Sequence, residues 1–262
     1  MAKKIVITSG KGGVGKTTVT ANLGIALSSA GFSVVLVDVD FGLNNLDVVM
    51  GVENKVVYDI ADVLEGRCRV KQALVRDLYN RNLYVLPSDS LRTGSSLNGQ
   101  NIKLIIDALA PSFDYVLIDC PAGIDIGFHR AVACADHAII VTTPCLTSLR
   151  DADKVVAILR SYKMSRIGLV VNRARGDLIV GEKMLHPEDI EGILKTELIG
   201  VLPEEDVVFL SLGSRLPRGS ESKKAYKILA QNVHKGSKKV YDVTGRYSGF
   251  LGSIRRSIKG SV

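Results

Sequence analysis

The stretch that decides the fold is Gly10-Lys11-Gly12-Gly13-Val14-Gly15-Lys16-Thr17-Thr18. It satisfies the pattern G-x-x-x-x-G-K-[ST] between a β-branched segment, Lys4–Thr8, and a segment with helical periodicity, Lys16–Ser29. Glycines allow the backbone N–H groups to point inward at phosphate oxygens, and the helix N-terminus adds partial positive charge. Lys16 is placed for the β- and γ-phosphates and Thr17 for Mg²⁺. The alternative is a glycine-rich turn without ligand, which is disfavoured because every position of the motif is filled. All nine residues, 10–18, are expected to bind nucleotide.

Short β-branched segments alternate along the chain with segments of helical periodicity. The expected strands are Lys4–Thr8, Val34–Asp38, Leu83–Leu86, Tyr115–Asp119, Ala138–Thr142, Ile167–Val171 and Leu198–Leu202. The expected helices are Lys16–Ser29, Asn101–Leu109, Gly127–Ala133, Ser148–Tyr162, Pro187–Lys195 and Glu221–Val233. Nearly continuous apolar runs are typical of parallel strands that helices cover on both faces. We therefore expect a doubly wound α/β fold, with a mostly parallel sheet and helices on both faces in a single P-loop domain.

The composition is that of a globular protein whose basic charge is concentrated near the carboxyl end. Hydrophobic residues make up 46% of the 262 residues and charged residues 23%, which excludes a wholly disordered chain. The formal net charge is +7, but residues 215–262 contain 12 Lys or Arg and two acids, so the preceding body is slightly acidic. Four scattered cysteines without CxxC spacing argue against a disulfide framework or a structural zinc site.

Acidic residues follow two of the expected strands, at the edge where open α/β sheets bind ligands. Asp38 and Asp40 occur in Val37-Asp38-Val39-Asp40, and Asp119 ends Leu117-Ile118-Asp119. An acid behind a phosphate-binding loop orients Mg²⁺ or its water shell. The alternative is a strand-end acid that caps a neighbouring helix. The order of these acids after the loop disfavours that alternative for Asp40 and Asp119, and less so for Asp38.

Recognition of the base is expected where two later strands end. Asn172 follows Gly168-Leu169-Val170-Val171, and its amide can pair with the donor and acceptor edge of adenine. Pro203 and Glu204 begin the loop after the next strand. No N-K-x-D guanine signature occurs in the sequence, so ATP is favoured over GTP.

The carboxyl-terminal segment is amphipathic when placed on a helix of about 100° per residue. Its apolar arc includes Phe250, Leu251, Ile254 and Ile258, and its basic flank includes Arg255, Arg256 and Lys259. This arrangement is typical of an interfacial membrane helix, although a surface helix packed on the body has the same pattern. A single tail should bind lipid marginally and two tails on one dimer more firmly. We expect a P-loop domain over residues 1–242 and a linker with a membrane-targeting helix over residues 243–262.

The early lysine of the loop marks a known subclass. Residues 10–18 resemble the deviant Walker A motif, and nearly the whole chain resembles the MinD members of the ParA/MinD family of ATPases. The resemblance also rests on Asn45-Leu46-Asp47-Val48-Val49-Met50-Gly51, Asp119-Cys120-Pro121-Ala122-Gly123, Arg150-Asp151-Ala152-Asp153 and the amphipathic terminus. The chain departs from the family pattern at Asn44, where an arginine is usual.

The resemblance implies roles for individual residues. Lys11 would contact phosphates bound by the other subunit of an ATP-dependent homodimer, although the sequence alone fits a solvated lysine equally well. Asp40 would position or deprotonate the attacking water, and Asp38 would support the same segment. The expected cofactor is Mg²⁺ with ATP. The expected catalytic residues are thus Lys11, Lys16 and Asp40, and the expected metal-site residues are Thr17, Asp38 and Asp119.

The resemblance also implies partners and a cellular role. It implies a slow, partner-stimulated ATPase in the cytoplasm, peripheral on the inner face of the cell membrane when ATP is bound. Such a protein recruits the division inhibitor MinC and positions the septum, under a topological regulator that is MinE or a polar scaffold. Asn45, Asp151 and Asp153 would contact partners, although an exposed pair of acids at a helix start is the plainer explanation for the last two.

Other classes share parts of this pattern. A ParA-type DNA-segregation ATPase would use basic residues on phosphate backbones, but the segregated apolar residues at the terminus favour anionic lipid over nucleic acid. A MinD-like flagellar-number regulator usually has an amino-terminal extension, which is not expected here. Iron–sulfur carriers with this loop need paired cysteines that bridge a cluster, and the cysteine positions here do not match that requirement. A non-enzymatic binding module would not need Asp40, so the presence of this acid argues against that class.

Overall fold

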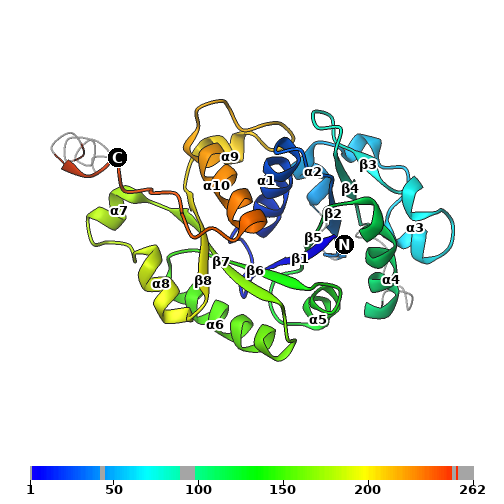
Figure 1. Ribbon diagram of the computed structural model, residues 1–262, viewed down its shortest axis with the longest axis horizontal. Helices are drawn as coiled ribbons and strands as arrows, with labels where there is room; N and C mark the ends of the chain where they lie inside the picture. Colours follow the sequence, from blue (N-terminus) through cyan, green and yellow to red (C-terminus); the bar gives the residue numbers. More distant parts are fainter. Residues whose placement is uncertain (1, 42–44, 89–97, 250–251, 253–262) are drawn as a thin grey trace.

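A single sheet lies at the centre of the part of the chain that the structure describes, residues 2–41, 45–88, 98–249 and 252 of a computed structural model (Figure 1). The order of its eight strands is β3-β4-β2-β5-β1-β6-β7-β8, and every neighbouring pair is parallel except β3 with β4. The strands are β1 (Lys3–Thr8), β2 (Val34–Asp38), β3 (Val75–Arg76), β4 (Leu83–Leu86), β5 (Tyr115–Asp119), β6 (His137–Thr142), β7 (Arg166–Ala174) and β8 (Glu197–Pro203).

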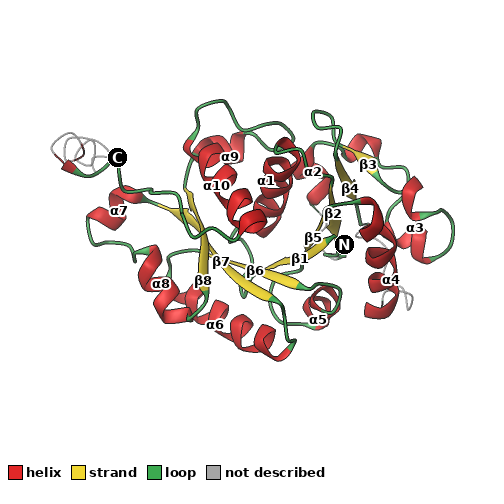
Figure 2. Cartoon of the chain, in the orientation of Figure 1, coloured by secondary structure: helices red, strands yellow, loops and turns green. Residues whose placement is uncertain are grey.

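Helices cover both faces of this sheet (Figure 2). One layer contains α1 (Lys16–Ser29), α2 (Leu46–Met50), α9 (Asp206–Leu210) and α10 (Glu221–Lys235). The other contains α3 (Ile60–Leu64), α4 (Gly99–Leu109), α5 (Ile126–Val132), α6 (Leu146–Ser161), α7 (Gly176–Val180) and α8 (Pro187–Leu194). Three short 3₁₀ helices are described at η1 (Glu53–Lys55), η2 (Val70–Gln72) and η3 (Ala110–Ser112). The described fold is thus the expected doubly wound arrangement.

Two hydrophobic cores lie on opposite faces of the sheet because successive side chains of a strand alternate in direction. In β1, Val6 packs into the core beneath α4, α5 and α6. Ile5 and Ile7 pack into the core beneath α1 and α10. Strands β2 and β5 are buried along their whole length, which explains their continuous apolar sequence.

Strand register decides where the functional side chains lie. The pairing of β2 with β5 places Asp38 beside Asp119 at the carboxyl edge. Strand β1 lies on the other side of β5, so the loop that follows it opens beside Asp119. The register therefore brings together residues that are far apart in the sequence.

The expected strands and helices are confirmed, with ends that differ by at most three residues. The predicted end of one strand, at Val171, is wrong. Strand β7 continues to Ala174, so Asn172 lies inside the strand and not after it. The pairing of β7 with β8 is irregular between Val171 and Ala174, which lets the strand extend past the apolar run. The elements that the sequence did not indicate include β3, α2, α3, α7 and α9, which are too short to show a period.

A pair of glycines joins α2 to the chain between α9 and α10. Gly51 has φ 66°, and a Cβ built on it would lie 2.4 Å from the Gly213 carbonyl oxygen. The Gly213 N–H in turn donates to the Val49 carbonyl at 3.0 Å. The two backbones thus approach closely enough to exclude a side chain at Gly51.

We expect Gly51→Ala to lower the free energy of unfolding by about 2 kcal/mol or more, because it adds both backbone strain and a steric conflict. Gly66→Ala is the matched control, since Gly66 has φ 72° with open space around it. Its cost should be about 1 kcal/mol, from backbone strain alone. Urea unfolding of both variants measures the difference. Equal costs for the two variants would show that the contact with Gly213 contributes nothing.

Candidate nucleotide-binding site

The phosphate loop connects β1 to α1 and has the backbone geometry that its glycines predict. Gly13 and Gly15 have φ of 77° and 94°, and Gly15 is the residue that precedes the first turn of α1. A Cβ on Gly15 would lie 2.5 Å from the amide nitrogen of Asn172. Glycine at this position therefore serves the left-handed backbone and the close approach of β7 alike.

Two tertiary contacts hold the loop in place. A Cβ on Gly10 would lie 2.3 Å from the Asp151 carbonyl oxygen, so the first turns of α6 pack directly on the start of the loop. At its other end, the Asn172 amide donates to the Val14 carbonyl at 2.8 Å. The loop is thus pinned from both α6 and β7, and its backbone amides need little reorganisation to receive an anion.

Lys16, Thr17 and Asp119 meet at the start of α1. Lys16 is buried, and its charge acts on the Asp119 carboxylate. The hydroxyls of Thr17 and Thr20 hydrogen-bond to the same carboxylate, Thr20 at 3.0 Å. Burial nevertheless raises the pKa of Asp119 to about 6, because these partners only partly offset the loss of solvent.

Asp38 and Asp40 lie next to this group at the end of β2. The Asp38 carboxylate accepts hydrogen bonds from the backbone N–H groups of Asp40, at 2.9 Å, and Leu46, at 3.3 Å. Burial and the repulsion of Asp119 raise the pKa of Asp38 well above its usual value. Both Asp38 oxygens therefore hold the segment that contains Asp40, and Asp40 itself is only half buried.

These oxygen donors fit Mg²⁺, which prefers hydroxyl, carboxylate and phosphate oxygens. Within the described residues no group of three or more His, Cys, Asp or Glu is placed to hold a metal by itself. An Mg²⁺ ion here would be held by Thr17 together with nucleotide oxygens, and Asp119 would act on its water shell.

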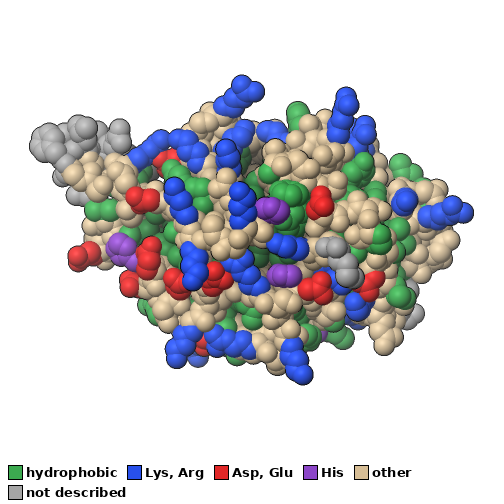
Figure 3. Space-filling model, viewed as in Figure 1, with side chains coloured by type: hydrophobic (Ala, Val, Ile, Leu, Met, Phe, Trp, Pro, Cys, Tyr) green, Lys and Arg blue, Asp and Glu red, His purple; other side chains and the backbone are tan. Residues whose placement is uncertain are grey.

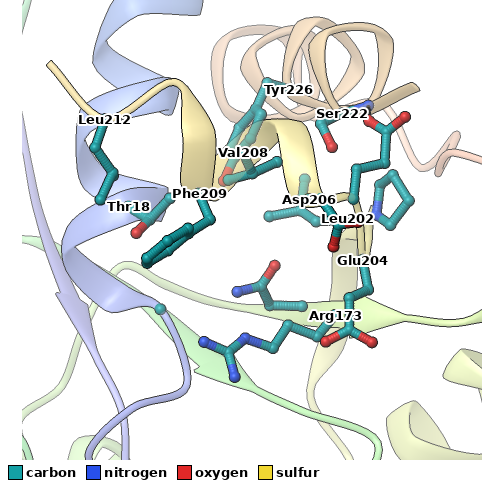
Figure 4. Close-up of a pocket in the computed structure, with 14 residues that line it drawn as sticks. Thr18, Arg173, Leu202, Glu204, Asp206, Val208, Phe209, Leu212, Ser222 and Tyr226 are labelled. Carbon is teal, nitrogen blue, oxygen red and sulfur yellow. Dashed lines mark hydrogen bonds between the residues drawn. The ribbon is translucent and has the colours of Figure 1, made fainter. Parts of the chain in front are cut away.

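A cavity of about 310 Å³ lies beside the loop, where the base and ribose of a nucleotide would extend. Of the expected residues, Gly15, Thr18, Asn172, Pro203 and Glu204 line it. Figure 4 shows side chains from β7, α9 and α10 around the same space. The sequence reasoning missed its other walls, which include Arg173, Val208, Phe209, Leu212 and Tyr226. The run Val207-Val208-Phe209-Leu210, directly after a loop at the carboxyl edge, was the signal available for Val208 and Phe209.

Lys11 lies apart from this group. Its side chain is exposed, and its Nζ is 3.4 Å from the Thr147 hydroxyl at the start of α6. Lys11 is not among the residues that line the base cavity. Within one chain, only Lys16 of the two loop lysines reaches the acids at the strand ends.

The expected partner residues lie on the surface near the site. Asn45 and Asp153 are exposed, whereas Asp151 is half buried and pairs with Lys154 at 3.3 Å. The expected membrane residues lie outside the described part of the chain: Phe250, Leu251, Ile254, Arg255, Arg256, Ile258 and Lys259. Asn44 lies outside it as well. Among the described helices, none is long and apolar enough to cross a bilayer.

The pKa of Asp119 makes a stability prediction for the protein without nucleotide. Because the folded state binds this proton more tightly than the unfolded chain does, the free energy of unfolding should fall as pH rises from about 4 to about 6. In Asp119→Asn the free energy of unfolding should fall by about 1–3 kcal/mol less over this pH range, because the variant has no carboxyl group to titrate there. The variant should also bind Mg²⁺–nucleotide more weakly. Urea unfolding in EDTA at several pH values tests this, with Asp153→Asn as an exposed control. Parallel pH profiles for wild type and Asp119→Asn would contradict it.

Comparison with known proteins places this geometry in a family. A family model described as an AAA domain matches residues 2–168. A septum site-determining protein MinD of Synechocystis sp. is 41% identical over 265 residues, covering 99% of this chain and all of that protein. A putative septum site-determining protein MinD of Guillardia theta is 47% identical over 211 residues, 80% of this chain and 78% of that protein.

Solved structures agree with these relatives. A chain of the MinC:MinD cell division protein complex of Aquifex aeolicus has a TM-score of 0.83 and 42% identity, covering 90% of this chain and 97% of that one. The septum site-determining protein MinD of Pyrococcus horikoshii, complexed with Mg-ADP, has a TM-score of 0.80 and 32% identity, with the same coverage. The chain therefore belongs to the MinD family of septum site-determining proteins, within the ParA/MinD group of P-loop ATPases.

Proposed function

We propose that this protein is an ATP-dependent, dimerising and membrane-associating ATPase that positions the division septum by recruiting a division inhibitor. The observation that supports it most is the pinned phosphate loop with Lys16, Thr17 and Asp119 at its end, beside a cavity for the base. A relative that was solved in a MinC:MinD complex supports MinC as the inhibitor.

Each residue of the site has a proposed part in hydrolysis. Lys16 and the loop amides bind the β- and γ-phosphates, and Mg²⁺, when bound, offsets phosphate charge. Thr17 and Asp119 would hold that ion and its water shell. Asp40 would orient the attacking water and accept its proton, while Asp38 keeps the Asp40 segment in position through two backbone hydrogen bonds.

Dimerisation would complete the site through Lys11. The side chain is exposed and has one long contact within its own chain, so it is available to a second subunit. Binding of the partner's phosphates by Lys11 would add a positive charge that neither chain supplies to its own site. Nucleotide binding and dimerisation would then be one event.

Membrane association would use the amphipathic residues 250–262, which follow a segment attached to the body. Val243 is buried in the core and its backbone packs against Gly176 at the start of α7, and Arg246 pairs with Glu221 at the start of α10. The amphipathic residues after these contacts would insert into anionic lipid, and the dimer would present two copies. Asn45, Asp151 and Asp153 would contribute to the surface for MinC and for a topological regulator, MinE or a polar scaffold.

One observation favours a second candidate, a DNA-segregating ATPase. Figure 3 shows many Lys and Arg side chains on the face that contains α10. The exposed lysines of this helix are Lys223, Lys224, Lys227 and Lys235. A basic face of this kind could bind phosphate backbones without sequence preference.

Asp40→Ala should lower kcat for ATP hydrolysis by about 100-fold or more while ATP affinity changes little, since Asp40 acts on water and not on the nucleotide. Measurements of steady-state phosphate release and of ATP binding separate the two effects. Glu53→Ala, an exposed acid on η1, is the control and should retain wild-type activity. A variant that still hydrolyses ATP at the normal rate would exclude Asp40 from catalysis.

Truncation after Ser248 should abolish ATP-dependent sedimentation with anionic vesicles, because it removes the amphipathic residues but keeps the Arg246–Glu221 pair. ATP binding by the truncated chain should be normal. Wild-type protein should bind vesicles more strongly with ATP than with ADP, since only the dimer presents two tails. Sedimentation with duplex DNA that survives truncation, together with equal vesicle binding in ATP and ADP, would favour the segregation function.

A further inference from the structure

A second cavity is lined by α1 and α10, farther along α1 from the phosphate loop than the base cavity. We call it the α1–α10 cavity. Its volume is about 450 Å³, larger than that of the base cavity, and its walls come from the carboxyl-terminal half of α1, the turn at Tyr79–Asn80, the segment Arg215–Leu216 and α10. The site and function described above leave it without a role.

Its lining combines an apolar floor with a basic rim. The floor is formed mainly by Ile25, Ala26 and Leu216, and the rim by Arg215, Lys223 and Lys227. Among the described residues that line the cavity there is no carboxylate. An anion that entered would therefore meet the two exposed lysines without acidic competition from the lining, whereas Arg215 is already paired with an acid behind it.

Arg215 is held in position before any ligand arrives. Its guanidinium pairs with the fully buried Asp77 side chain and lies 4.8 Å from the centre of the Tyr79 ring. Asp77 also accepts hydrogen bonds from the backbone N–H groups of Tyr79, at 2.9 Å, and Asn80, at 2.7 Å. Arg215 is thus a fixed part of the wall, attached to the turn between β3 and β4 with its charge paired to Asp77, and Lys223 and Lys227 supply the positive charge for an anion.

We propose that the α1–α10 cavity binds a free anionic amphiphile, with an apolar body as small as a short acyl chain and a phosphate or carboxylate head. The apolar body would cover Ile25, Ala26 and Leu216, and the head would pair with Lys227 and Lys223. Inorganic phosphate leaves the floor uncovered, and a neutral amphiphile leaves the cations unpaired. Because the cavity is concave, it suits a single molecule better than the flat surface of a bilayer.

The cavity is separate from the nucleotide site, although the two share a wall. Tyr226 is fully buried and lines both spaces. On α1, Thr18 lines the base cavity and Asn22 the second cavity, with the Asn22 amide donating to the Thr18 carbonyl at 3.0 Å. An occupant of one cavity therefore need not displace the occupant of the other.

Titration calorimetry of the full chain with dihexanoyl phosphatidic acid, below its micelle concentration and with saturating Mg-ADP, tests the proposal. We expect one binding site per chain. Inorganic phosphate and dihexanoyl phosphatidylcholine should each bind about tenfold more weakly or worse. Lys227→Glu should weaken phosphatidic acid by about tenfold or more, and Ser29→Trp should do so by filling the cavity from an exposed position.

Lys224→Glu is the matched control, because Lys224 is an exposed lysine on α10 that does not line the cavity. It should leave the affinity unchanged, and all variants should retain Mg-ADP binding, which is measured separately. The proposal is overturned if no binding is seen, if Mg-ADP displaces the lipid, or if phosphatidylcholine or phosphate binds equally well. It is also overturned if Lys224→Glu weakens binding as much as Lys227→Glu, or if only vesicles bind.

Discussion

The site depends on two carboxylates that the parallel register buries side by side at the carboxyl edge of the sheet. Asp38 and Asp119 are 1% and 2% exposed, and their mutual repulsion adds to the cost of burial. Backbone N–H groups hold Asp38, while hydroxyls and Lys16 hold Asp119. Ionisation of these two acids beside the phosphate loop is thus costly in the protein without nucleotide. A bound cation would relieve that cost, which links the stability of the fold to occupancy of the site.

The contacts that pin the phosphate loop also connect it to distant surfaces. Gly10 packs on the backbone of α6, the helix that presents Asp151 and Asp153, and Asn172 ties the loop to β7 and the base cavity. Helices α1 and α10 contribute walls to both the base cavity and the second cavity. A close-packed interior has low compressibility and transmits strain. A rearrangement of the loop on nucleotide binding would therefore displace α6 and α1 first, because these helices contact the loop directly.

The site residues that the sequence predicted lie in local motifs, whereas those that it missed are brought to the site by tertiary structure. Lys16, Thr17, Asp38 and Asp119 were predicted because strand ends and a glycine loop are local features, and the sheet edge then brings them together. Phe209 and Arg173 were missed because they belong to a five-residue helix and to an irregular strand end. Asn172 was predicted to contact adenine and lines the base cavity, and its amide also donates to the Val14 carbonyl, a contact that no local pattern indicates.

The order of amino acids by itself determined the alternation of strands and helices, the phosphate loop, the acids at the strand ends and the concentration of basic charge after residue 214. These follow from periodicity, glycine content and charge, which neighbours along the chain express without tertiary contacts. Only the tertiary structure decided that Asp38 lies beside Asp119, that α6 supports Gly10, and that α1 and α10 enclose a second, basic cavity. Those facts depend on strand order and helix packing, which set residues distant in sequence against each other.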